Sequence, residues 1–138
     1  MRRTAAVAAL VLAIGACSSP TEVVVDEVWS LPVPPVSPAS AIFFDITNGL
    51  DTIVAITGAT SPACDRFELH ETSFDDANVM AMRPIAEIRI PPGESRQLVP
   101  GATHLMCIGP QVFEGSFDVT LSMTNTADIT VNVAIEQR

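Results

Sequence analysis

Hydrophobic and polar residues alternate along most of the chain in short runs, and the runs are rich in β-branched and aromatic residues. A period of two places one face of a strand in a core and the other in water. The runs that predict strands are residues 21–29, 41–47, 51–57, 66–70, 84–90, 95–99, 103–108, 116–123 and 129–135. No segment among them has a convincing helical period. The pattern therefore predicts an all-β sandwich or barrel of about eight or nine strands.

Turn residues separate these runs. Asn48-Gly49 lies between two apolar runs, which is a strong signal for a β-hairpin. Residues 31–38 (LPVPPVSP) contain four prolines, which cannot donate hydrogen bonds to a sheet, so this stretch is expected to be a loop or an edge crossing. Residues 72–78 are polar and predict another loop.

The N-terminus has the pattern of a secretory signal. Arg2 and Arg3 precede an apolar run over residues 4–16, which is shorter than the roughly 20 residues that span a bilayer as a helix. The segment 14–17 (IGAC) resembles the bacterial lipobox, whose cysteine is acylated and becomes the mature N-terminus. The alternative is an ordinary cleaved signal followed by a chance cysteine.

The lipobox interpretation divides the chain into three parts. We expect residues 1–16 to be a lipoprotein signal peptide, residues 17–21 to form a short tether with Cys17 lipidated, and residues 22–138 to fold as one domain. This arrangement predicts an extracytoplasmic lipoprotein, held by its lipid at a membrane in the periplasm or on the outer face of the cell membrane.

The charge of the chain excludes nucleic acid as a partner, and the spacing of its polar residues gives no support to catalysis. The full chain has 7 basic and 16 acidic residues, and removal of Arg2 and Arg3 with the signal would change its net charge from −9 to −11. Nucleic-acid binding depends on clustered basic groups, which are missing from this sequence. No nucleophile, histidine and acid stand at a recognised spacing, so we do not expect an enzyme.

Candidate chemistry is concentrated around two histidines, His70 and His104. Met106 follows His104 by two residues, so on an extended strand both side chains point to one face and can chelate one ion. Met80 and Met82 follow His70 across the polar stretch, which could fold back over the end of the strand. Imidazole with thioether is a soft set of donors that favours Cu(I), although a strand methionine is more often core filler.

The spacing of these residues resembles the signature of the PCuAC periplasmic copper chaperones: His-Met, ten residues, Met, 21 residues, His-x-Met. Here His70-Glu71 is followed by ten residues, Met82, 21 residues and His104-Leu105-Met106. Further segments of the sequence that resemble the family are residues 26–29, 44–48, 68–72, 82–84, 91–93 and 100–101. The resemblance covers about residues 23–133.

The resemblance implies a cupredoxin-like Greek-key β-sandwich with an exposed Cu(I) site formed by His70, Met82, His104 and Met106. It also implies a metallochaperone that passes copper to an acceptor, such as the CuA centre of cytochrome c oxidase or another copper carrier, or that serves general copper homeostasis. The alternative function is a lipid-anchored binding or adhesion module that has the fold without the metal. In that case the four side chains would not converge.

Several residues near the motif have two interpretations. Met80 lies outside the family spacing, and Glu71 stands where many members have methionine. Glu68 and Glu71 could orient the second ring nitrogen of His70 or could be solvated carboxylates.

Cys64 and Cys107 could form a disulfide or remain free thiols. Strand alternation places Cys107 on the face opposite Met106, whereas Cys64 shares its parity with His70. A free Cys107 could be an alternative Cu(I) ligand, and a blue-copper electron carrier would need such a ligand.

Overall fold

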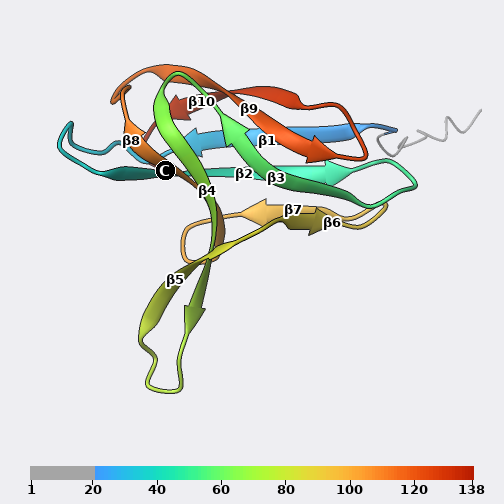
Figure 1. Ribbon diagram of the computed structural model, residues 1–138, viewed down its shortest axis with the longest axis horizontal. Coiled ribbons are helices and arrows are strands. Elements are labelled where there is room, and N and C mark those ends of the chain that lie inside the picture. Colours follow the sequence, from blue (N-terminus) through green and yellow to red (C-terminus); the bar gives the residue numbers. More distant parts are fainter. Residues whose placement is uncertain (1–20) are drawn as a thin grey trace, which may run out of the picture.

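The chain forms a β-sandwich in a computed structural model that describes residues 21–138 (Figure 1). Its strands are β1 (Val23–Ser30), β2 (Ala39–Asn48), β3 (Val54–Thr60), β4 (Cys64–Phe74), β5 (Met80–Ile85), β6 (Ile88–Ile90), β7 (Ser95–Leu98), β8 (Thr103–Pro110), β9 (Ser116–Thr124) and β10 (Ile129–Ile135). No helix in the described part of the chain is long and apolar enough to cross a membrane. The predicted signal peptide and Cys17 lie outside the described residues.

The strands pair in the order β5-β4-β8-β2-β1-β10-β9-β3-β6. The first half of β2 bonds to β8 and its second half bonds to β7. The pairing of β1 with β10 is parallel, and the other pairings among the described strands are antiparallel. The all-β sandwich is thus confirmed, with ten strands where eight or nine were expected.

The core follows from the alternation of residues along the strands. Alternate residues of β2, namely Ile42, Phe44 and Ile46, are almost fully buried, and they join inward side chains of the other strands in one cluster. The remaining large and fully buried members are Val54, Ile56, Ile90, Leu98, Leu105, Val119, Leu121 and Val133. The inward faces of the described strands thus share one apolar core, and burial of apolar area is the main force that stabilises a fold.

The predicted hairpin at Asn48-Gly49 is wrong, because β2 and β3 do not pair with each other. Asn48 is completely buried: its Nδ2 donates to the carbonyl oxygens of Thr52 and Ile90, and its Oδ1 accepts from the N–H of Leu50. The amide side chain thereby satisfies the backbone of a crossing between separate parts of the sheet, where a hairpin would have satisfied it by strand pairing.

The polar stretch after His70 is also different from its predicted loop. β4 continues to Phe74 and pairs with β5 in a hairpin that projects from the body of the sandwich (Figure 1). We call residues 70–85 the arm. At its tip, Oδ1 of Asp75 accepts from the N–H groups of Ala77 and Val79, and Asn78 adopts a left-handed conformation with φ of 59°. The single strand predicted over residues 84–90 is divided between β5 and β6.

Cys64 and Cys107 form a disulfide. Cys107 points inward from β8 and is fully buried, whereas Cys64 is the first residue of β4 and follows a turn in which its N–H donates to the carbonyl oxygen of Ser61. Its position at the end of the strand releases Cys64 from the alternation that would turn it toward the outer face. The free-thiol alternative, including copper ligation by Cys107, does not apply to this structure.

Candidate metal centre

The four predicted ligands lie on one face of three neighbouring strands, β5, β4 and β8. His70 of β4 stands directly opposite His104 of β8, and on its other side it stands opposite Pro84 of β5. Met106 is opposite Glu68, and Met82 is opposite Thr72. Opposite residues in an antiparallel pair share a face, as do residues two apart on one strand. The register therefore places both thioethers on the face that carries the two imidazoles.

This face is the outer one, because the intervening residues Leu69, Leu105 and Cys107 point into the core. Exposure varies across it: His104 is 4% exposed, Met106 is partly buried and Met82 is 51% exposed. His70 and His104 adjoin, with 5.7 Å between their ring centroids. Met106 lies two residues after His104 on β8. Met82 lies on the arm, opposite Thr72 and therefore diagonal to His70.

Each imidazole is held by an acceptor on one nitrogen and is unpartnered on the other. His70 Nε2 donates to Glu68 Oε2 at 2.8 Å, and His104 Nδ1 donates to the carbonyl oxygen of Ala102 at 3.1 Å. A carboxylate and a carbonyl can only accept, so they select the tautomer in which the remaining nitrogen has a lone pair. Among the described residues, Nδ1 of His70 and Nε2 of His104 are the buried side-chain nitrogen or oxygen atoms without a hydrogen-bond partner.

An aromatic wall supports the buried side of the site. Phe43, 3% exposed, lies 6.2 Å from the ring of His104 and 4.8 Å from the ring of Trp29, between centroids. The guanidinium of Arg138 lies over Trp29 at 5.4 Å. The wall places the apolar ring of Phe43 beside His104, and this ring offers no hydrogen-bonding group to the free nitrogen.

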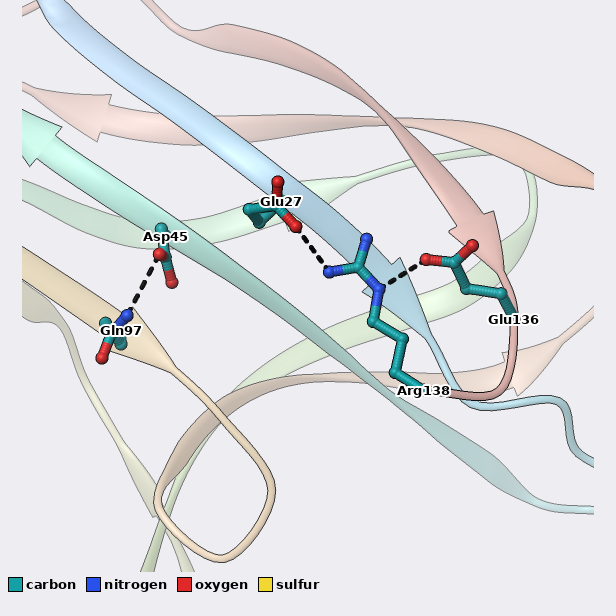
Figure 2. Close-up of polar contacts among 5 residues, drawn as sticks. All are labelled: Glu27, Asp45, Gln97, Glu136 and Arg138. Atoms are coloured by element: carbon teal, nitrogen blue, oxygen red, sulfur yellow. Dashed lines mark hydrogen bonds and ion pairs between the residues drawn. The ribbon is translucent and has the colours of Figure 1, made fainter.

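Charged groups secure this wall at its far end. Figure 2 shows Glu27 and Glu136 accepting from the guanidinium of Arg138. Glu27 has a left-handed φ of 52° and lies in a bulge of β1 between Asp26 and Trp29. The same view shows Gln97 of β7 donating to Asp45 of β2, which ties these neighbouring strands at their surface.

Burial and hydrogen bonds shift two pKa values at the site. Burial lowers the pKa of His104, the proximity of His70 lowers it further, and the hydrogen bond to Ala102 partly opposes the shift. The pKa of Glu68 is also lowered, first by its hydrogen bond from His70 and then by that from Arg66. Glu68 is thus favoured in the anionic form that accepts from His70, and His104 is favoured in the neutral form that can bind a metal.

The alternatives for the two glutamates are resolved by the register. Glu68 shares the face of His70 and orients its ring, whereas Glu71 points to the other face and pairs with Arg83 at 2.7 Å. In the described chain, no three or more His, Cys, Asp or Glu side chains cluster as a metal site.

Some participants could not be found from the sequence pattern. The acceptor of Ala102 is a backbone carbonyl, which any residue type supplies. Phe43 belongs to a run of apolar residues in β2, so its outward direction becomes visible only once Ile42 and Phe44 are known to point inward. Trp29 lies in a segment, residues 26–29, that resembles the PCuAC family sequences, but its contact with Phe43 depends on the pairing of β1 with β2.

Comparisons with known proteins agree with this architecture. Residues 23–135 match the family described as "LpqE-like: Putative lipoprotein LpqE-like". A protein of Leifsonia xyli subsp. xyli (strain CTCB07), "Putative lipoprotein Lxx21020", is 33% identical over 70 residues. That match spans 51% of this chain and 42% of the relative, so it covers less than half of the relative's length.

Solved structures with the same fold include the "Copper-bound PCuAC domain from PmoF2", with a TM-score of 0.72, 15% identity, and coverage of 85% of this chain and 94% of that one. The "Solution structure of CuI-DR1885 from Deinococcus Radiodurans" has a TM-score of 0.65, 22% identity, and coverage of 89% and 83%. These likenesses confirm the fold that the resemblance to PCuAC domains implied.

Proposed function

Since this chain belongs to the LpqE-like family of lipoproteins, we propose that it is an extracytoplasmic metallochaperone that binds one Cu(I) ion through His70, Met82, His104 and Met106. The observation that carries this proposal is the pair of buried, unpartnered nitrogens, His70 Nδ1 and His104 Nε2, on neighbouring strands. An unpaired buried polar atom costs free energy, and a bound metal would offset that cost.

The composition of the site selects the metal. Two imidazoles and two thioethers are soft, neutral donors, a set that suits Cu(I) better than Zn²⁺ or Mg²⁺. The solved structures named above include a copper-bound and a Cu(I)-bound protein with this fold, which supports the same choice. Thioethers bind without losing a proton, so the ion can be taken up or released at constant protonation of these two ligands.

The division of the ligands between rigid and exposed elements suits a carrier. His104 is buried between Phe43 and His70 and is fixed by the carbonyl of Ala102, whereas Met82 is half exposed on the projecting arm. An acceptor can approach the exposed thioether and replace it, while the imidazoles retain the ion until new ligands are in place. A completely enclosed site would hold copper too firmly for delivery.

We propose further that the protein is anchored through acylated Cys17 and delivers copper to a protein on the same side of the membrane. The binuclear CuA centre of cytochrome c oxidase and a second copper carrier are the candidate acceptors. Both candidates are consistent with ligand exchange, because thiolate or imidazole ligands of the acceptor compete directly with the thioethers.

The test is anaerobic titration of residues 21–138 with Cu(I) against a chromophoric chelator. We expect the wild type to withhold one equivalent, and the His104→Ala, Met106→Ala double variant to lose it. Met123→Leu is the matched control, because it removes a thioether from β9, which pairs with β10 and β3 and not with the strands of the site, and this variant should still withhold one equivalent. Circular dichroism establishes that each variant is folded.

The result that would refute the metal site is failure of the folded wild type to compete with the chelator at all. The protein would then be a lipoprotein sandwich without metal, which is the binding or adhesion module considered above. Retention of copper by the folded double variant would place the ion elsewhere and would refute the ligand assignment.

A further inference from the structure

A second methionine projects from the arm beside Met82. Met80 and Met82 are two residues apart on β5, so their side chains share one face, and they stand opposite Phe74 and Thr72 of β4. Both are about half exposed, at 53% and 51%. Two thioethers are therefore accessible from solvent near the end of a projecting hairpin.

The register places the soft donors of this face in a continuous series. From the tip of the arm inward, the series runs from Met80 to Met82 on β5, then to His70 on β4 and to His104 and Met106 on β8. Exposure falls along it, from 53% at Met80 to 4% at His104. Met80 and Met82, like His104 and Met106, are two residues apart on one strand, His70 and His104 are directly opposite, and Met82 is diagonal to His70; these relations correspond to about 5 to 8 Å between Cα atoms.

We propose that Met80 and Met82 form a transient Cu(I) site at the outer end of this series, through which the ion enters and leaves the imidazoles. The proposal rests on the proposed copper-binding function and assigns a role to Met80, which lies outside the four-ligand motif. The ion remains Cu(I) throughout: each step forms one bond from copper to a nitrogen or sulfur donor and breaks another, with no electron transferred.

The chemistry of the pair fits a transient site. A methionine side chain is unbranched, has three rotatable bonds and carries a polarizable thioether, so two of them can reach one ion without distortion of the strand. They carry no charge and the pair itself supplies only two thioethers, so it binds Cu(I) less firmly than the inner set, which adds two imidazoles. Weak exposed ligands followed by stronger buried ones give inward capture, and an acceptor that binds copper more tightly reverses the direction.

The arm is built to hold this pair in position. Six register pairs join β4 to β5, from Leu69 with Ile85 to Phe74 with Met80, and the carboxylate of Asp75 caps the turn. On the face away from the methionines, Arg83 of β5 pairs with Glu71 of β4. The tip therefore presents Met80 from an ordered strand.

The test measures the rate of Cu(I) transfer from the loaded protein to a chromophoric chelator by anaerobic stopped flow. Met80→Leu keeps the apolar volume but removes the sulfur. We expect it to bind one equivalent and to release it about tenfold more slowly, since loss of a ligand contact worth about 1.4 kcal/mol in the transition state is a factor of ten. Met80→His supplies a different Cu(I) donor at the same position and should restore the rate.

Phe74→Leu is the matched control, because it changes the exposed apolar residue opposite Met80 without removing a donor, and it should transfer copper at the wild-type rate. A Met80→Leu protein that transfers its copper as fast as the wild type overturns the transient site and leaves the four-ligand site standing. Slowing by Phe74→Leu to the same extent as Met80→Leu also overturns it, since apolar contact would then explain the effect. A wild type that holds no copper overturns both proposals.

Discussion

Loss of the Cys64–Cys107 disulfide should destabilise the domain by about 4 kcal/mol. The bond joins residues that are 43 apart, and closing a loop of this length removes about 13 cal/mol/K of entropy from the unfolded chain in the chain-entropy model. At the stability typical of a domain of this size, such a loss is a large fraction of the whole. We expect the midpoint of thermal unfolding to fall by about 15 °C, at about 4 °C per kcal/mol for a domain of this size.

Urea unfolding of metal-free residues 21–138 measures this effect, because this segment contains no other cysteine. The wild type is compared before and after reduction, since reduction breaks the cross-link and keeps both sulfur atoms in place. The Cys64→Ala, Cys107→Ala variant is the second comparison, and it should be less stable than the reduced wild type because Cys107 is fully buried and the smaller side chain leaves a cavity.

The slope of the unfolding free energy against urea provides an independent check. An unfolded chain without the cross-link is more expanded and exposes more surface, so the slope should rise on reduction. A fall of less than about 1 kcal/mol with an unchanged slope would refute the reasoning, because it would mean that the cross-link hardly restricts the unfolded chain.

Two further predictions concern the metal site. Bound imidazoles must be neutral, so protons compete with Cu(I) as the pH falls. Burial lowers the pKa of His104, so protonation of this ligand begins to compete below the usual histidine pKa of about 6.5. A Cu(I) affinity that stays flat from about pH 7 to about pH 5 in chelator competition would contradict histidine ligation. Replacement of Glu68 by Gln removes the anion that orients His70, and we expect the Cu(I) affinity to fall by about tenfold or more in the same competition. Glu71→Gln on the opposite face is the control and should leave the affinity unchanged. A Glu68→Gln affinity equal to that of the wild type would show that His70 needs no such partner.

The alternation of apolar and polar residues was sufficient to predict the class of fold, because a strand with one buried face has an apolar residue at every second position. The interior of β8 and β10 could be located in this way. Alternation was insufficient at Asn48-Gly49, where a typical hairpin dipeptide lies at a crossing. Its buried amide bonds to the carbonyl of Ile90, a partner 42 residues away that no local signal identifies.

The arm shows the same limit from the opposite side. Residues 72–78 are polar because both faces of a projecting hairpin meet solvent, and a strand without a buried face has no alternation by which to recognise it. Met80 and Met82 were therefore expected to reach His70 from a loop. The structure places them on a strand that pairs with β4, which determines the face to which both thioethers point.

The motif alone was enough to nominate four donors and to place His104 and Met106 on one face, since two residues of separation on a strand require it. Only the tertiary structure decided that His70 stands opposite His104, that Glu68 and Ala102 each occupy one ring nitrogen, and that Cys64 reaches Cys107. The physical reason is that the direction of a side chain follows from its own strand, whereas its neighbours across the sheet follow from the register between strands distant in sequence, which the packing of the whole core selects.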